Sequence, residues 1–139
     1  MNRVALALAV ASVTLAGCGS VTTTSALAQW AHQSNFEQSV SILLTDARHA
    51  ASALRATSTL NDLHTVCAVL LVDVQSANAA LPTPDSQTSK LLSNAYNDLG
   101  AGANRCYVAD SVSRRERALA DLTRGAGELV EARTRVRTT

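Results

Sequence analysis

Apolar residues recur three and four positions apart through most of the chain after residue 35, which is the period of an amphipathic α-helix. Residues 35–55 form the first such segment, and Thr57-Ser58-Thr59 interrupts the pattern after it. We therefore predict a helix over residues 35–55 with one buried side. That side would consist of Phe36, Val40, Leu43, Ala47, Ala50 and Leu54.

The segment between Thr59 and Pro82 has the most regular repeat in the chain. Thr59 and Asp62 have the spacing of a capping box, which predicts that the helix starts there. Its buried side would consist of Leu60, Leu63, Cys67, Leu70, Val74, Ala77 and Leu81. Four more apolar residues widen this side, so we expect this helix to be the most buried: Val66, Val69, Leu71 and Val72.

Two more helices are predicted after Pro82. Thr83 can cap the first, with Pro84 at the first helical position, where its missing N–H costs nothing. Gly100 and Gly102 would weaken that helix. Its buried side would be Thr88, Leu92, Ala95, Leu99, Gly102 and Cys106. Ser113 and Glu116 have capping-box spacing before the last helix, whose buried side would be Val112, Leu119, Leu122, Ala126, Leu129 and Val136. Arg115 and Arg133 interrupt this side, which we interpret as frayed helix ends.

The fold class predicted from these segments is all-α, a small antiparallel four-helix bundle over residues 35–139. Composition agrees, because aromatic residues make up only 3% of the chain and only two prolines occur. Residues 26–34 are ambiguous: Leu27, Trp30 and Ala31 could open a helix or lie loosely against the bundle.

The first seventeen residues have the pattern of an export signal. A basic start at Arg3 precedes about thirteen apolar or small residues, too few to span a bilayer, which requires roughly twenty. The run closes with Leu15, Ala16, Gly17 and Cys18, which resembles the lipobox of bacterial lipoproteins. The resemblance implies cleavage before Cys18 and attachment of diacylglycerol to its thiol. An ordinary secreted protein and an uncleaved anchor are the alternatives.

This reading divides the chain into three parts. Residues 1–17 would be the signal peptide, residues 18–34 the lipidated cysteine with a flexible tether, and residues 35–139 the helical domain. Lipid on Cys18 would hold the protein to the outer face of the cell membrane, stably if more than one acyl chain is attached.

Cys67 and Cys106 remain after Cys18 is lipidated, and both fall on predicted buried faces. An exported compartment is oxidising, which favours a disulfide between them. A symmetric hairpin about Thr83 would leave Cys106 roughly 10 Å too far along its helix. A tall turn at Pro82 or a kink at Gly100 could recover the register.

A metal site is the alternative interpretation of these cysteines. His64 lies three residues before Cys67, and His49 lies in the preceding helix, so zinc could be held by two cysteines with histidines. A disulfide beside a histidine is favoured, because the chain has no CxxC or HExxH. A di-iron centre is disfavoured because Glu-x-x-His is absent, and Asp46 with His49 is interpreted as a solvated pair. We expect no metal and no cofactor.

Candidate chemistry elsewhere is sparse. No phosphate-binding loop or Gly-x-Ser-x-Gly motif occurs, and glutamate and histidine are few, so we expect no enzymatic activity. Loss of Arg3 would leave eleven basic and eleven acidic residues, which disfavours nucleic-acid binding. Residues 111–139 nevertheless carry seven arginines against four acids. Arg133, Arg135 and Arg137 could touch anionic lipid head groups, although a solvated, frayed terminus is the preferred interpretation.

The stretch from Cys67 through Leu81-Pro82-Thr83-Pro84-Asp85 to Cys106-Tyr107 resembles small uncharacterised lipoproteins of actinobacteria, including mycobacteria. That resemblance implies an exported helical domain and supplies no catalytic residues. Two functions are open. The first is an interaction or structural module of the cell envelope that docks a protein partner. The second is a carrier of a small apolar ligand or lipid between the helices.

Overall fold

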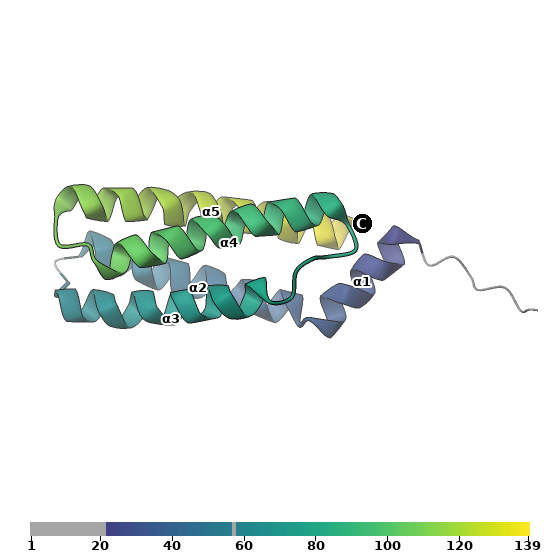
Figure 1. The fold of residues 1–139 in the computed structure, drawn as a ribbon, viewed down its shortest axis with the longest axis horizontal. Helices are drawn as coiled ribbons and strands as arrows, with labels where there is room; N and C mark the ends of the chain where they lie inside the picture. Colours follow the sequence, from purple (N-terminus) through teal and green to yellow (C-terminus); the bar gives the residue numbers. More distant parts are fainter. Residues whose placement is uncertain (1–21, 57) are drawn as a thin grey trace, which may run out of the picture.

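The computed structural model describes residues 22–56 and 58–139, which form helices only. The predicted leader, the lipobox and Cys18 lie outside these ranges. The helices are α1 (Thr23–Gln33), α2 (Phe36–Arg55), α3 (Leu60–Asn78), α4 (Ser86–Tyr107) and α5 (Val112–Thr138). Helices α2 to α5 run alternately up and down the long axis, and α1 lies at one end at an angle to them (Figure 1). The predicted all-α fold and four-helix bundle are confirmed.

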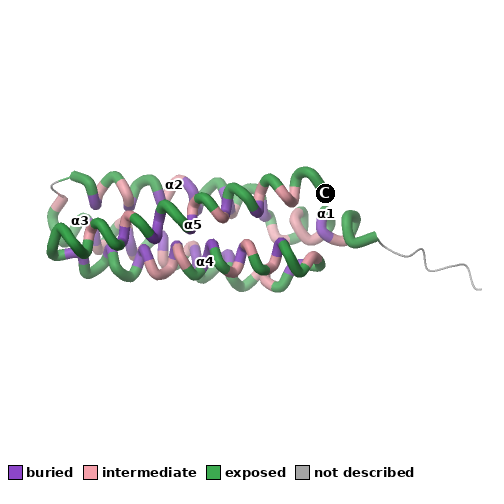
Figure 2. The backbone as a smooth tube through the Cα atoms, turned by 90° about the horizontal axis from the view of Figure 1, so that it is seen from above, coloured by how far each residue is buried: buried purple, intermediate pink, exposed green. Residues whose placement is uncertain are grey.

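The buried residues face one shared core between α2, α3, α4 and α5 (Figure 2). All six residues predicted for the inner side of α2 are buried, and so are all six predicted for α4. On α3 the prediction is wrong at Leu60, which is 43% exposed. It is also wrong in making α3 the most buried helix, because Val69 and Val72 are 49% and 62% exposed. Both valines lie on the side of α3 turned away from its helical neighbours.

Helix α1 decides between the alternatives left open for residues 26–34, because residues 23–33 are helical, and the predicted tether is helical from Thr23 onward. Thr22 caps the helix by accepting a hydrogen bond from the Ser25 N–H. Leu27 is 1% exposed, and the Trp30 indole donates a 2.9 Å hydrogen bond to the carbonyl of Ala80. Helix α1 thus packs against α2 and α5 through a short apolar face, and Trp30 joins it to the segment that follows α3.

The connections between helices are set by polar side chains. The capping box of Thr59 and Asp62 is present as predicted. Thr83, however, is not the cap of α4. Asp85 has that role, because its carboxylate accepts the Thr88 N–H at 2.9 Å. Thr83 is buried instead, with its N–H donating to the Ser89 hydroxyl at 2.8 Å.

Helices α4 and α5 approach each other through glycines. A Cβ at Gly125 would lie 2.8 Å from the Leu99 nitrogen, and one at Gly102 would lie 2.7 Å from a methyl carbon of Leu122. Helix α4 nevertheless runs unbroken through Gly100 and Gly102. None of the helices in the two described ranges is long and apolar enough to span a bilayer.

The buried side of α5 differs from the prediction because small residues form much of it. It consists of Ala118, Asp121, Leu122, Gly125, Leu129 and Ala132. Leu119, Ala126 and Val136 are only partly buried, and Val112 is 74% exposed. The N-cap is Ser111 rather than Ser113, and no side chain caps it.

Candidate functional site

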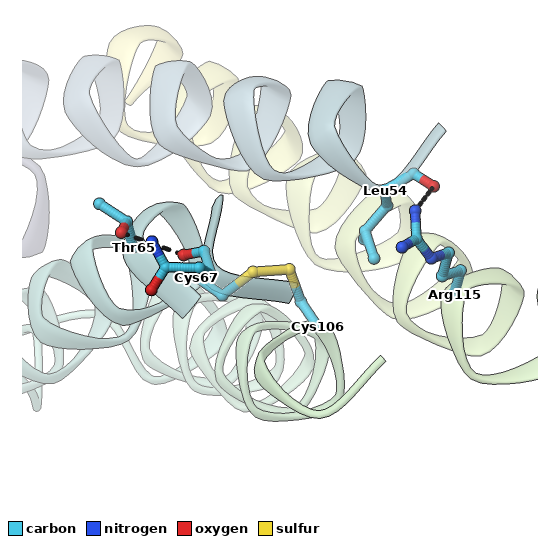
Figure 3. Close-up of a disulfide and its surroundings, with 6 residues drawn as sticks. Leu54, Thr65, Cys67, Cys106 and Arg115 are labelled. Carbon is cyan, nitrogen blue, oxygen red and sulfur yellow. Dashed lines mark hydrogen bonds between the residues drawn. A yellow bond between two sulfur atoms is a disulfide. The ribbon is translucent and has the colours of Figure 1, made fainter. Parts of the chain in front are cut away.

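The disulfide joins α3 and α4 close to the end of the bundle opposite α1. Cys67 and Cys106 are both fully buried, with their Cα atoms 5.9 Å apart (Figure 3). This separation is ordinary for a disulfide. The sequence placed Cys106 too far along its helix to reach Cys67. The connection over residues 79–85 removes this mismatch, because it extends past the end of α3 before α4 begins (Figure 1). The predicted pairing of the two cysteines is therefore present, with no break in α4.

The histidines predicted as possible zinc ligands have other surroundings. His64 stacks on Tyr107, with ring centroids 4.1 Å apart and an interplanar angle of 12°. The described residues contain no group of three or more histidine, cysteine or acidic side chains that could hold a metal ion. Asp46, predicted to be solvated, is partly buried, and its pKa is raised by burial and by the neighbouring carboxylate of Asp73.

Arg115 holds together the two turns at this end of the bundle. Its guanidinium donates to the carbonyls of Leu54 at 3.4 Å, Ala56 at 2.9 Å and Ser58 at 3.1 Å. Figure 3 shows Arg115 reaching from α5 to Leu54 at the end of α2. These carbonyls belong to the last turn of α2 and the link that follows, where helical partners are lacking. Arg115 therefore has a structural role, and the expectation of a frayed end is wrong here.

Exposed apolar and basic side chains gather around these two turns. Leu60 begins α3, Tyr107 ends α4, Val108 follows it, and Val112 begins α5; their exposed fractions are 43%, 43%, 53% and 74%. Val108 also borders a shallow hollow of about 150 Å³ together with Arg105, Arg114 and Arg117. We call these residues the tip surface: Leu60, Arg105, Tyr107, Val108, Val112, Arg114 and Arg117.

The arginines of the tip surface differ in how far they are neutralised. Arg105 pairs with the buried Asp121, and Arg114 pairs with Asp110 at 3.0 Å. Arg117 donates a 3.5 Å hydrogen bond to the Ser113 hydroxyl and has no carboxylate partner among the described residues. Between residues 105 and 121, which include the partner of Arg105, four arginines face three acids, so this segment carries one excess positive charge.

The opposite end of the bundle holds the other arginines that the sequence left uncertain. Arg133 and Arg137 both bind the Glu37 carboxylate, with nitrogen to oxygen distances of 2.7–2.8 Å. Arg135 binds the Asp85 carboxylate at 2.9 Å. These pairs join the end of α5 to the starts of α2 and α4. The expected frayed, solvated terminus is thus corrected: α5 is helical to Thr138 and cross-linked by ion pairs.

The hydrogen-bonding arginines depress the pKa of both carboxylates. The pKa of Glu37 is lowered to about 2, first by the Arg137 hydrogen bond and further by Arg133. The Arg135 hydrogen bond, with further bonds from Thr88, holds the pKa of Asp85 well below its usual range. Both acids are therefore ionised at neutral pH and paired with these arginines.

Fold and site together define a disulfide-linked helical bundle with an apolar, basic tip. No family model matches the chain, and no curated protein or solved structure is significantly similar to it. Sequence reasoning missed the tip surface, because Leu60 and Val112 were assigned to the core. Both residues come directly after a predicted turn, and this position could have indicated that they lie at the exposed end of the bundle.

Proposed function

We propose that this protein is a lipid-anchored module of the cell envelope that docks a partner protein through its tip surface. The observation that carries the proposal is the gathering of exposed apolar residues and arginines at one end of the bundle. Exposed apolar patches of this kind mark interaction sites, and tyrosine and arginine are enriched among residues that dominate binding energy.

The sequence Leu15-Ala16-Gly17-Cys18 supports the anchor and the outer face of the cell membrane as its location. A lipid on Cys18 would restrict the bundle, because five residues span at most about 18 Å between Cys18 and Thr23. Helix α1 lies at the end opposite the tip surface (Figure 1). A helix of 27 residues such as α5 is about 40 Å long. Anchored in this way, the tip surface would stand away from the bilayer, open to other envelope components.

The charge and shape of the tip surface indicate the chemistry of its partner. A short apolar segment would cover Val108 and Val112, and acidic side chains beside it would meet Arg114 and Arg117. Complementary charge of this kind guides association and rejects basic partners. We therefore assign the partner as a protein with an apolar segment flanked by aspartate or glutamate.

The alternative function, a carrier of a small apolar ligand, has less support. Close approach of α4 and α5 fills the middle of the bundle, and the hollows around the described residues open to solvent. Carriers enclose most of the ligand surface in a pocket of several hundred cubic ångströms. The bundle therefore fits a docking module better than a carrier.

The anchor is tested by mass spectrometry of the N-terminal peptide from native cells, compared with the Cys18→Ser variant. We expect a diacylglyceryl group on Cys18 and membrane fractionation that the variant loses. A bare cysteine, or wild-type protein in the medium, would contradict the anchor without affecting the bundle.

Docking is tested by cross-linking in native cells with wild type, a Val108→Asp/Val112→Asp variant and the control Val72→Asp. Val72 is also exposed, at 62%, but lies on the outer side of α3. We expect one cross-linked protein to be captured by wild type and the control and lost from the tip variant. The purified partner should then bind the isolated chain more weakly as salt rises. Loss from Val72→Asp alone, or equal capture by all three, would contradict the tip surface as the site.

A further inference from the structure

A second candidate site lies at the other end of the bundle, where α1 turns into α2. A groove of about 300 Å³ lies there between α1, α2 and α3, with Tyr96 of α4 also in its wall. Asn35 forms the turn with a positive φ of 49°, a conformation that asparagine tolerates better than most residues. We call this hollow the elbow groove.

Aromatic rings form part of the wall of the elbow groove. The rings of Trp30 and Phe36 have centroids 5.3 Å apart and are tilted by 47°. The hydrogen bond from the Trp30 indole to Ala80 fixes that ring in place. Ile42 lies at the groove with 43% of its surface exposed. Burial raises the pKa of Tyr96 to about 12, so its phenol is neutral at physiological pH.

The only charged residue in the lining of the groove is Asp73. Asp46 lies one helical turn beyond Ile42, and its pKa is raised by burial, by a hydrogen bond with Asp73 and by the charge of Asp73, while His49 opposes the shift. No lysine or arginine of the described ranges forms a salt bridge with Asp46 or Asp73. Asp73 thus lines the groove without a lysine or arginine partner, and a carboxylate beside an apolar, aromatic wall favours a positively charged ligand.

We propose that the elbow groove binds a small alkylammonium ion, with the ammonium against Asp73 and the carbon chain along Trp30, Phe36 and Ile42. The size of the groove is at the lower limit of small-molecule sites, which suits a ligand of a few carbons. An anion would be repelled by Asp73. A divalent metal ion would require six or more oxygen ligands or a compact set of acidic and histidine groups, which the described residues lack.

The proposal is independent of the membrane anchor and of the tip surface. It would hold for a soluble form of the chain, and its failure would leave both parts of the proposed function untouched. The elbow groove and the tip surface lie at opposite ends of the bundle (Figure 1).

Trp30 provides a direct readout, because it is the only tryptophan in the chain. The full-length protein in non-ionic detergent is titrated with n-butylammonium chloride while its fluorescence is recorded. Butanol, sodium butyrate and matched sodium chloride are the comparison ligands, and free N-acetyltryptophanamide corrects for collisional quenching. We expect a saturable change with butylammonium and none with butyrate or sodium chloride.

Asp73→Asn is expected to raise the dissociation constant about tenfold, because a charge-assisted contact is lost. The control Glu116→Gln, an exposed acid near the start of α5, should bind as wild type does. Circular dichroism verifies that the Asp73 variant is folded, and Ile42→Ser tests the apolar contact separately. The proposal is overturned if butanol binds equally well, if no saturable change occurs, or if folded Asp73→Asn keeps the wild-type affinity.

Discussion

Gly125 of α5 lies against the main chain of Leu99 in α4, so that a Cβ at position 125 would come within 2.8 Å of the Leu99 nitrogen. The carbonyl oxygen of Ala95 lies at 2.9 Å from the same point. Main-chain atoms cannot rotate away as a side chain can. This contact therefore fixes how closely the two helices pack.

Gly125→Ala is expected to destabilise the protein by about 1–3 kcal/mol, the usual cost of overpacking a core. Gly127 is the matched control, because it is in the same helix and a Cβ there meets no atom within 4 Å. Gly127→Ala should stabilise the protein by about 1 kcal/mol through helix propensity. Urea unfolding of both variants measures the difference. Equal stabilisation by both would show that the close packing is not required.

Removal of the disulfide in a Cys67→Ala/Cys106→Ala variant should lower the free energy of unfolding by roughly 3–4 kcal/mol. The bond closes a loop across a sequence separation of 39 residues, and the loop-entropy model gives this magnitude. Urea unfolding with and without a reductant checks it. The reductant should destabilise wild type and leave the double variant unchanged.

Arg115→Met should destabilise the protein by about 1–3 kcal/mol, because three main-chain carbonyls lose hydrogen bonds from a charged donor. Arg117→Met is the control, since its guanidinium bonds only to a serine hydroxyl of its own helix. Hydrogen exchange measures the local effect. Amides of residues 58–63 should exchange faster in the Arg115 variant alone, and protection equal to wild type would rule out the role given to Arg115.

Glu37 should contribute stability that depends on pH. Its pKa is lowered from 4.5 to about 2, mainly by Arg137, so its contribution is complete above about pH 5. That contribution is lost as pH falls from 4.5 towards 2. Wild type and Glu37→Gln are compared by urea unfolding between pH 2 and 7. The difference between them should shrink at low pH and in high salt, because the Glu37 side chain is 46% exposed. A difference independent of pH would contradict the ion pair.

Glu128 should have the opposite effect. One of its carboxylate oxygens is buried without a hydrogen-bond partner, and its pKa is raised first by burial and then by the charge of Asp98. The ionised form is therefore disfavoured in the folded state, and stability is lost as pH rises above the unfolded pKa. Glu128→Gln should be more stable than wild type at pH 7 and no more stable at pH 3. A gain of the same size at both values would point to a cause other than charge.

The helical period was enough to predict most of the fold. Alternating spacings of three and four identified α2, α3 and α4, and Thr59 with Asp62 located one helix start. Helix α5 was also predicted, but its buried side was only partly right, because Gly125 and Ala132 have too little apolar surface to register in a hydrophobic pattern. The pattern left α1 undecided, because its few contacts include the carbonyl of Ala80, fifty residues away.

The arginines were the hardest residues to interpret from sequence. Arg115, Arg133 and Arg135 appeared to interrupt the last helix or belong to a frayed end. Their partners lie in α2, the turn after it, and the start of α4. A side chain this long reaches whatever the tertiary fold places nearby, so its role cannot be derived from local spacing. The same holds for Asp46, whose neighbour Asp73 is on another helix.

Helix α1 is attached to the rest of the protein by far fewer contacts than the other helices. It packs on α2 and α5 with Leu27 buried, the Trp30 indole bonds to Ala80, and an asparagine joins it to α2. Such a segment can detach at a free energy well below that of global unfolding. Detachment would remove Trp30 from the elbow groove while the four long helices stay folded. A ligand bound in the elbow groove would then stabilise the attached position of α1. Attachment of α1 would in turn strengthen ligand binding.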